Sequence, residues 1–223
     1  MKEIVIFGTG KIADCVSYYF EREGDYRIVA YCCDRTFLKE KTFNGRPVVA
    51  FEEIVSLYPP ERYAMFIALG YHEVNALRTQ KYHEGLAKGY ILASYVSPYV
   101  HGTFTIGANS LLLDNAVVQP KVTIGNNTFI WGGSMIGHHA IIKDHCWVTG
   151  SANVGGLSTI GEGCFLGLNA TIGHGVEVGS SSIIGANTLI TKPVASESVI
   201  VSSDTEIHRL KVHQFLRLTS CFR

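Results

Sequence analysis

The chain has 223 residues, which is enough for one large domain or for two small ones that each bury a core. Lys and Arg together number 19, as do Asp and Glu, so the basic excess typical of nucleic-acid-binding proteins is absent. The apolar run at the N-terminus is too short for a secretory signal, and no run approaches the roughly 18 apolar residues of a membrane span. We therefore expect a cytoplasmic protein with neither a membrane span nor a nucleic-acid partner.

The cysteines are consistent with that compartment because none of them form a Cys-x-x-Cys pair. Cysteines without such pairs are expected to remain free thiols in a reducing environment. They are Cys15, Cys32, Cys33, Cys146, Cys164 and Cys221. The 23 glycines are concentrated after residue 100, which indicates that the two halves of the chain differ in architecture.

The pattern of residues 1–93 predicts a small Rossmann-like α/β domain. It opens with an apolar strand, a glycine turn and an amphipathic helix, and Gly8-x-Gly10-x-x-Ala13 has the spacing of a phosphate-binding loop. There Gly8, Gly10 and Lys11 would approach the phosphates of a nucleotide, because glycine lets backbone N–H groups come close to them. This signal is weak by itself, since many such matches are only tight strand-to-helix turns.

Two further strands continue this domain. Residues 26–33 form an apolar run that ends at Asp34, near the distance at which an acidic residue contacts a ribose hydroxyl. Another apolar run, residues 64–69, leads to Gly70, expected beside the base, and then into a helix. The whole segment matches one mononucleotide-binding half and is too short for a full dinucleotide site. The sequence therefore favours a nucleotide or a nucleotide-linked ligand over a nicotinamide cofactor.

A period of six residues governs residues 94–194. Every sixth residue from Ile106 to Ile190 is Ile, Leu or Val, and the residue four places later is small or β-branched. This period fits neither an amphipathic helix nor a hairpin sheet, but it fits a coil of three short flat faces with 18 residues per turn. Stacked coils then pair as parallel strands about 4.8 Å apart. We therefore predict a parallel β-helix, followed by a C-terminal capping segment over residues 195–223.

Three histidines in the segment IGHHAIIKDH are the candidate chemical groups of this region. With 18 residues per coil, His138 lies at a corner directly under Gly156, whose bare backbone could hydrogen-bond a bound group. His174 shares this column and is expected to be a solvated turn residue. His139 and His145 should point outward in different directions, so the cluster seen along the chain is not expected in space.

The two-part layout, the IGHH segment and the segment VGGLSTIGEGCFLGLNATIG one coil later resemble the hexapeptide-repeat sugar acetyltransferases of bacteria, which are left-handed parallel β-helices. The most similar members are nucleotide-amino-sugar N-acetyltransferases and sialic-acid O-acetyltransferases. The resemblance implies that His138 is the general base and that the amide of Gly156 holds the acetyl carbonyl. It also implies acetyl-CoA as co-substrate, CoA contacts at Gly156, Leu168 and Ala186, no metal, and a homotrimer with the site between subunits.

Several positions depart from the family pattern. His139 stands where many relatives carry an acid that orients the base, and it is expected near the site as an orienting or substrate-contacting group. Trp131 and Trp147 replace an asparagine and a histidine, and these indoles are expected to reshape the acceptor pocket or to stack on a sugar or base. A zinc site like that of gamma-class carbonic anhydrases, which share the repeat, is disfavoured because Lys143 stands where a histidine is required.

The C-terminal segment lacks the Gly-x-Pro-Ala-Lys sequence with which relatives help to hold CoA. Ser203-x-x-Glu206 has the spacing of a capping box, and the residues after it predict a short basic amphipathic helix. Two hypotheses stay open. The helix closes the end of the β-helix with Lys211 and Arg217 near the CoA phosphates, or it is a solvated capping helix.

The leading functional hypothesis is an acetyl-CoA-dependent N-acetyltransferase that acts on a nucleotide-linked amino sugar in surface-glycan assembly. A sugar O-acetyltransferase of the same superfamily ranks lower, because a hydroxyl needs a stronger base and the sequence offers His138 no visible carboxylate partner. The hypothesis from a different class is a catalytically silent trimeric β-helix that acts as a scaffold or ligand sensor.

Overall fold

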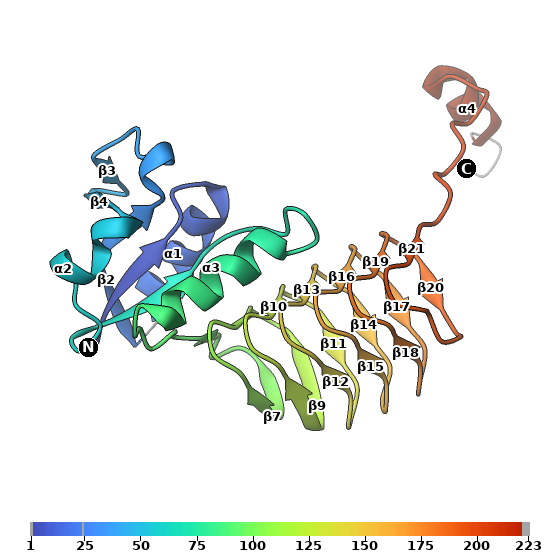
Figure 1. Cartoon of the computed structure of the whole chain (residues 1–223). Helices are drawn as coiled ribbons and strands as arrows, with labels where there is room; N and C mark the ends of the chain where they lie inside the picture. Colours follow the sequence, from blue (N-terminus) through green and yellow to red (C-terminus); the bar gives the residue numbers. More distant parts are fainter. Residues whose placement is uncertain (1, 24, 220–223) are drawn as a thin grey trace.

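The computed structural model describes residues 2–23 and 25–219, and it confirms the fold class predicted from the sequence. Figure 1 shows a small α/β part at the N-terminus, a stack of short parallel strands, and a short helix near the C-terminus. Within the described residues, none of the helices has the length and apolar character needed to cross a membrane.

The N-terminal α/β part is built around a sheet with the strand order β3-β4-β2-β1-β5. The neighbouring strands of this sheet are parallel, except that the edge strand β3 runs antiparallel to β4. The strands are β1 (Lys2–Phe7), β2 (Tyr26–Cys33), β3 (Thr42–Phe43), β4 (Arg46–Ala50) and β5 (Tyr63–Ile67). The helices are α1 (Lys11–Glu23), α2 (Ile54–Leu57) and α3 (Ala76–Ala87), with 3-10 turns at Arg35–Phe37 and Phe51–Glu53.

Helices cover both faces of this sheet, as expected for parallel strands that are apolar on both sides. α1 packs Val16 and Phe20 against one face. α3 packs Tyr82 and Gly85 toward the other face, where Met65 and other apolar side chains of the strands lie. The carboxyl ends of β1, β2 and β5 meet at one edge of the sheet, where open α/β sheets bind their ligands.

The second part of the chain is a parallel β-helix with three faces, which we name A, B and C in chain order. Strands of successive coils pair in register 18 residues apart, as Phe129 pairs with Trp147 and Trp147 with Phe165. Face A contains β6 (Tyr95–Val96), β8 (Leu111–Leu112), β10 (Phe129–Ile130), β13 (Trp147–Val148), β16 (Phe165–Leu166), β19 (Ile183–Ile184) and β21 (Val199–Ile200). Face B contains β11 (Met135–Ile136), β14 (Asn153–Val154), β17 (Thr171–Ile172) and β20 (Leu189–Ile190), and face C contains β12 (Ile141–Ile142), β15 (Thr159–Ile160) and β18 (Glu177–Val178). In the first coils, β7 (His101–Ile106) and β9 (Val117–Ile124) run along both B and C.

The corners of the β-helix, named AB, BC and CA after the faces that they join, alternate with these strands. The aliphatic residues of the six-residue period fill the interior, where Ile130, Ile136 and Ile142 are fully buried. Small residues fill the tighter space, and the Sγ of Cys146 donates a hydrogen bond to the carbonyl of Gly161. The described cysteines are free thiols, and Cys221 lies outside the described residues.

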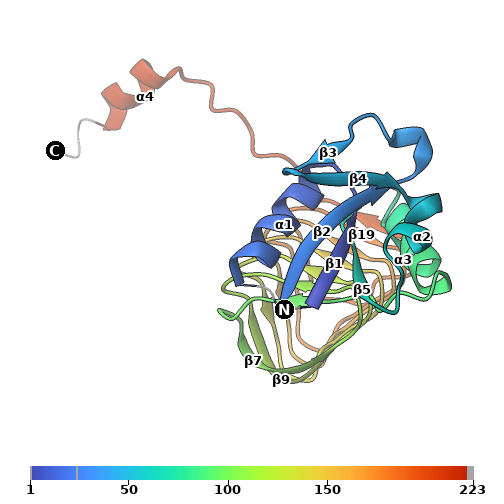
Figure 2. The ribbon, with the colours of Figure 1, turned by 90° about the vertical axis from the view of Figure 1, so that its left-hand side faces the viewer.

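The α/β part is fixed to face A by a shared apolar core. The outward side chains of Leu111, Phe129 and Trp147 on face A belong to one cluster with Phe20 of α1 and Phe66 of β5. The rings of Phe66 and Phe129 are stacked with their centroids 5.5 Å apart. Figure 2 views the β-helix nearly end-on and shows the sheet and α1 lying against it. The two parts of the chain therefore share an apolar core, which is distinct from the interior of the β-helix.

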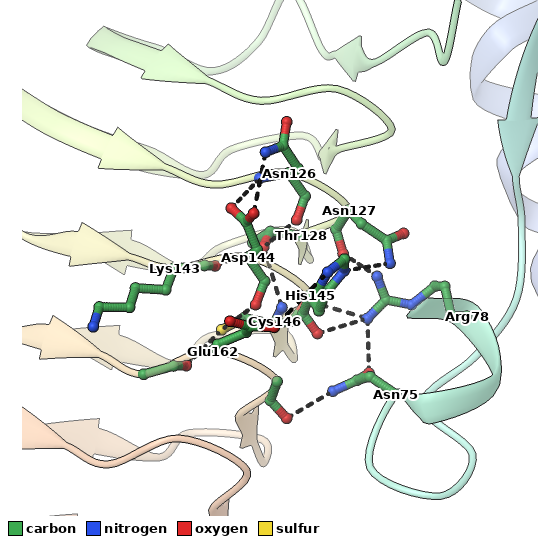
Figure 3. A network of polar contacts seen from close by, with 12 residues as sticks. Asn75, Arg78, Asn126, Asn127, Thr128, Lys143, Asp144, His145, Cys146 and Glu162 are labelled. Carbon is green, nitrogen blue, oxygen red and sulfur yellow. Dashed lines mark hydrogen bonds and ion pairs between the residues drawn. The ribbon is translucent and has the colours of Figure 1, made fainter. Parts of the chain in front are cut away.

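Arg78 of α3 adds a polar connection at corner CA (Figure 3). Its guanidinium is fully buried and donates hydrogen bonds to the backbone carbonyls of Asn127, His145 and Cys146 and to Oδ1 of Asn75. Burial lowers the pKa of Arg78 to about 9, so the side chain still carries its charge at neutral pH. A buried cation thus bridges the helix and three carbonyls of the β-helix.

The C-terminal segment leaves the β-helix after β21. Ser202 still contacts the last coils, where its Oγ donates to the carbonyl of Ala186 at 2.8 Å. The chain then extends to α4 (Val212–Thr219), which Figures 1 and 2 show away from the rest of the molecule. The predicted helix exists, but Ser203 and Glu206 lie well before it and do not form its capping box. α4 does not close the end of the β-helix in this structure.

Candidate functional site

His138 lies at corner BC, directly after strand β11 of face B. Gly156 occupies the same corner one coil further on, as the 18-residue period predicts. A Cβ built on Gly156 would lie 2.8 Å from Nε2 of His138 and 2.9 Å from its Cε1. The imidazole therefore lies over a position that is free of side-chain atoms only because the residue is glycine. His138 itself is exposed, so a ligand can reach the ring.

In the part of the chain that the structure describes, the backbone N–H of Gly156 is a donor without a partner. The N–H groups on either side of it are used, since Gly155 donates to the carbonyl of Ile172 and Leu157 donates to that of His138. The N–H of Gly156 makes no hydrogen bond within the described part of the chain, although the residue is buried. An unpaired buried donor is costly until an outside oxygen accepts from it. Corner BC thus combines a proton acceptor with a hydrogen-bond donor.

His139 and His174 join His138 in a group of three imidazoles. Nδ1 of His138 and Nδ1 of His139 are 3.1 Å apart. The ring centroid of His174 lies 5.8 Å from that of His138, across the corner occupied by Gly156. His139 is exposed, as expected for an outward corner residue, but its ring turns toward His138 at a left-handed corner with φ 60°, so these two histidines are close in space although no cluster was expected. Among the residues that the structure describes, no three His, Cys, Asp or Glu side chains are arranged to hold a metal ion.

His145 lies apart from this group, at corner CA beneath α3 (Figure 3). The expectation that it faces outward into solvent is wrong, because the α/β part covers this corner and leaves the residue 4% exposed. Its Nδ1 lies 2.9 Å from Nδ2 of Asn127, whose Oδ1 in turn accepts from Nδ2 of Asn109. Burial lowers the pKa of His145 to about 4, so the ring is neutral at neutral pH.

The glycine loop lies at the carboxyl edge of the sheet, between β1 and α1. Gly8 has φ 124°, which glycine tolerates, and a Cβ there would stand 2.8 Å from the carbonyl oxygen of Ala68. Gly10 has no atoms within 4 Å of its Cβ position and immediately precedes Lys11, the first residue of α1. Gly70, after β5, lies beside the start of α1. The open backbone at this helix N-terminus is suited to an anion such as a phosphate.

Asp34, expected to contact a ribose, lies at the end of β2 and is engaged by a lysine that the sequence did not single out. Nζ of Lys81 is 2.6 Å from Oδ1 of Asp34 and 2.8 Å from Oε2 of Glu84. Burial opposes the charge of Lys81, but the two carboxylates outweigh that effect and raise its pKa. A cavity of about 200 Å³ opens at the ends of β1 and β2, with Thr9 and Cys33 in its lining. Asp34 directly follows Cys33, so its carboxylate lies at the same carboxyl edge of the sheet as this cavity, but Asp34, Lys81 and Glu84 are not among its lining residues.

The two tryptophans lie between the α/β part and face A. Trp147 is 2% exposed and its ring centroid is 5.5 Å from that of Trp131. Because its indole is buried, Trp147 has no free face to stack on a sugar or base, and the expectation that it reshapes the acceptor pocket stays a prediction. Tyr71, which follows Gly70, is the exposed ring of this group and lies against Trp147 and Phe165 at 5.2 and 4.7 Å. Tyr71 had no predicted role, although it directly follows the strand-end glycine Gly70.

Leu168 and Ala186 share a column at corner AB, one coil apart. Both are exposed. They therefore lie on a different edge of the β-helix from His138 and Gly156, which occupy corner BC. The glycine loop lies on yet another side, over face A. A single chain thus carries the expected acetyl, CoA and nucleotide positions on three separate surfaces.

The β-helix is similar to the hexapeptide repeats of bacterial transferases. Two family models match it: the bacterial transferase hexapeptide (six repeats) over residues 105–138, and the hexapeptide repeat of succinyl-transferase over residues 158–192. The resemblance that the sequence predicted is thereby confirmed at the level of the repeat. No curated protein sequence matches the chain.

Solved structures extend this similarity to both parts of the chain. A variant of perosamine N-acetyltransferase from Caulobacter crescentus, in complex with CoA and GDP-perosamine, is similar with a TM-score of 0.82 and 20% identity over 91% of this chain and 94% of that one. The acetyltransferase domain of PglB from Neisseria gonorrhoeae, in complex with acetyl coenzyme A, is similar with a TM-score of 0.80 and 22% identity over 89% and 95%. The chain therefore has the complete fold of these sugar acetyltransferases, including the N-terminal α/β part.

Proposed function

We propose that this protein is an acetyl-CoA-dependent N-acetyltransferase that acts on a nucleotide-linked amino sugar. One observation carries the proposal: Nε2 of His138 lies over Gly156, whose buried N–H has no partner in the described chain. An acyl transfer to an amine requires both groups, a base for the proton of the nucleophile and a donor for the oxygen that becomes negative.

The proposed reaction begins when the neutral amine of the sugar attacks the carbonyl carbon of the acetyl thioester. The new C–N bond forms as the C=O electrons move to oxygen, and the N–H of Gly156 donates to this oxyanion. Nε2 of His138 takes the proton that the nitrogen loses. When the C–S bond breaks, the imidazolium returns the proton to the departing CoA thiolate. The products are the N-acetyl sugar and CoA, and His138 is neutral again.

The α/β part supports a nucleotide as the handle of the sugar. At Gly10 and Lys11 the loop offers open backbone at a helix N-terminus, which suits a diphosphate, whereas the N–H of Gly8 already donates to the carbonyl of Cys32 and Gly8 shapes the turn. The polar group around Asp34 lies at the same edge of the sheet, where Lys81 and Asp34 could exchange partners with ribose hydroxyls. The similar Caulobacter crescentus protein is described in complex with GDP-perosamine, an amino sugar carried on a nucleotide.

The proposed enzyme works as a homotrimer. In one chain, His138 at corner BC and the expected CoA positions Leu168 and Ala186 at corner AB lie on different edges. Three triangular β-helices around a threefold axis would bring corner BC of one copy to corner AB of the next. The CoA pantetheine would then lie in the gap between two subunits, with its thioester at His138.

The proposal is tested with purified full-length protein, acetyl-CoA and a panel of UDP-, dTDP- and GDP-linked amino sugars, with CoA release as the readout. We expect turnover with at least one amino sugar and none with the corresponding hydroxyl sugar. His138→Ala should lower kcat by about 10²–10⁴-fold, the usual contribution of a general base. Absence of both turnover and CoA binding would favour the silent scaffold, and turnover only with hydroxyl sugars would favour O-acetylation.

The shared site has its own test. His138→Ala and Leu168→Glu each remove a different side of the proposed gap, so both variants should be inactive alone. Unfolding the two together and refolding the mixture would create trimers in which some gaps have both sides intact. We expect activity to reappear in the mixture. A mixture as inactive as its components, from subunits shown to have exchanged, would place the whole site within one chain.

A further inference from the structure

The contact between His138 and His139 depends on which of the two rings carries a proton on Nδ1. Their Nδ1 atoms are 3.1 Å apart, and two bare nitrogens at that distance would place lone pair against lone pair. One of the two rings must therefore carry its proton on Nδ1 and donate it to the other. Which ring donates determines which nitrogen of His138 is free to act.

We propose that His139 is a positioning residue: its Nδ1 accepts a hydrogen bond from Nδ1–H of His138, which holds the base in the tautomer with a bare Nε2. This inference rests on the proposed function, since the base must present Nε2, the nitrogen nearest Gly156. A neutral imidazole has only one proton, so placing it on Nδ1 leaves Nε2 without one. The opposite assignment would put the proton on Nε2 and remove the base.

The backbone holds His139 in place for this task. Its φ of 60° is in the left-handed region, and its N–H donates to the carbonyl of Pro120 on the preceding coil. The N–H of His138 is fixed in the same way by Oε1 of Gln119 at 2.8 Å. Hydrogen bonds to the preceding coil therefore fix the main chain of the corner that carries both rings.

The partner of His138 is the imidazole of His139, which has no negative charge, whereas a carboxylate at this position would supply one. Besides His139, the titratable ring in contact with His138 is that of His174, and Lys121 occupies the corner below His139. Within the described chain, no carboxylate forms a hydrogen bond or an ion pair with the ring of His138, His139 or His174. A protonated His139 could no longer accept from His138.

Three substitutions of His139 test this hydrogen bond. Oδ1 of asparagine can stand where Nδ1 of His139 stands, and asparagine tolerates left-handed backbone, so His139→Asn keeps the acceptor. His139→Asp keeps it and adds a charge. His139→Leu removes it, and the corner accepts leucine because Leu157, at the same position one coil further on, has φ 61°. His139→Leu should therefore remove the hydrogen bond and leave the fold unchanged.

In the assay described above, we expect His139→Leu to lower kcat at least tenfold, a part of the roughly 10²–10⁴-fold that a base supplies, with KM for acetyl-CoA unchanged. His139→Asn should recover most of kcat. His139→Asp should move the acidic limb of the kcat/KM profile to higher pH, because its charge keeps His138 protonated longer. A leucine variant as active as wild type would overturn the proposal.

The tautomer can also be measured without turnover. Protein labelled with ¹⁵N in its histidines gives two-bond ¹H–¹⁵N correlations that distinguish an Nδ1–H from an Nε2–H ring. We expect the Nδ1–H tautomer for His138 in the wild type and in His139→Asn, and a mixture in His139→Leu. An Nε2–H ring in the wild type would overturn the proposal even if the acetyltransferase assay succeeds. The expected tautomer with no turnover on any sugar would instead count against the proposed function.

Discussion

His138 and Gly156 occupy the same corner on successive coils, and Nε2 of the histidine lies 2.8 Å from where a Cβ of residue 156 would be. Gly156→Ala should therefore push the imidazole aside without changing the coil, because the methyl group meets a side chain and not backbone. We expect kcat to fall roughly 10- to 10³-fold, within the range known for lost oxyanion donors and misplaced bases. Thermal unfolding should shift little. A variant with full activity would show that the ring position does not matter.

Alanine substitutions at Gly10 and Gly8 should distinguish a glycine that approaches the ligand from one that the fold requires. Gly10→Ala adds a methyl group in open space, so the midpoint of thermal unfolding should stay within about 2 °C, whereas KM for the nucleotide sugar should rise if phosphates approach there. Gly8→Ala meets the carbonyl of Ala68 at a φ of 124° and should destabilise the fold as well. An unchanged KM in Gly10→Ala would remove the loop from the proposed site.

Arg78 should contribute more to stability than any exposed residue of α3. Arg78→Met leaves the carbonyls of Asn127, His145 and Cys146 without their donor in a buried place. We expect a loss of at least about 2 kcal/mol in the free energy of unfolding, which corresponds to about 4–8 °C in Tm. Gln80→Met, on the exposed side of the same helix, is the matched control and should shift Tm by less than about 2 °C.

The buried His145 should make the protein sensitive to acid. Its pKa is about 4 in the folded chain and near 6.5 when unfolded, so the unfolded state binds the proton first. Stability should therefore fall as the pH drops from about 6.5 to about 4, by up to about 3 kcal/mol, and this contribution should stay constant below that. His145→Asn fits the left-handed corner, as Asn109 and Asn127 do, and should flatten this part of the curve. Urea unfolding at several pH values gives the free energy of unfolding of the wild type and of His145→Asn. The same dependence on pH in both proteins would contradict the role of His145 in acid sensitivity.

The six-residue period was sufficient to predict the β-helix, because each residue's direction depends only on its own coil. It placed His138 under Gly156, where the structure has it. The same regularity could not say which outward residues are covered. Trp147 and His145 are outward positions like many others, and they are buried only because a separate part of the chain packs over them.

Contacts between the two parts were correspondingly the least predictable. Arg78 and Lys81 lie at helical spacing with Tyr82 and Gly85 on the buried stripe of α3, a signal that two cations face inward. That signal was present in the sequence, but its meaning depended on carbonyls and carboxylates from distant segments. The close approach of His139 to His138 was missed for a local reason, since an outward corner residue with left-handed backbone can still turn its ring sideways.

The apolar core shared by the α/β part and face A has a consequence for substrate choice. Opening a hinge between the two parts would expose Phe129 and Trp147 to water and break the bonds of Arg78. Hinge closure is therefore not available to carry a bound nucleotide toward a distant histidine. In the proposed enzyme, the distance between the nucleotide crevice and the acetyl donor is therefore fixed by the fold. If the protein acts on a nucleotide-linked amino sugar as proposed, the length of the substrate from base through diphosphate to amine would then select it as much as the contacts at either end.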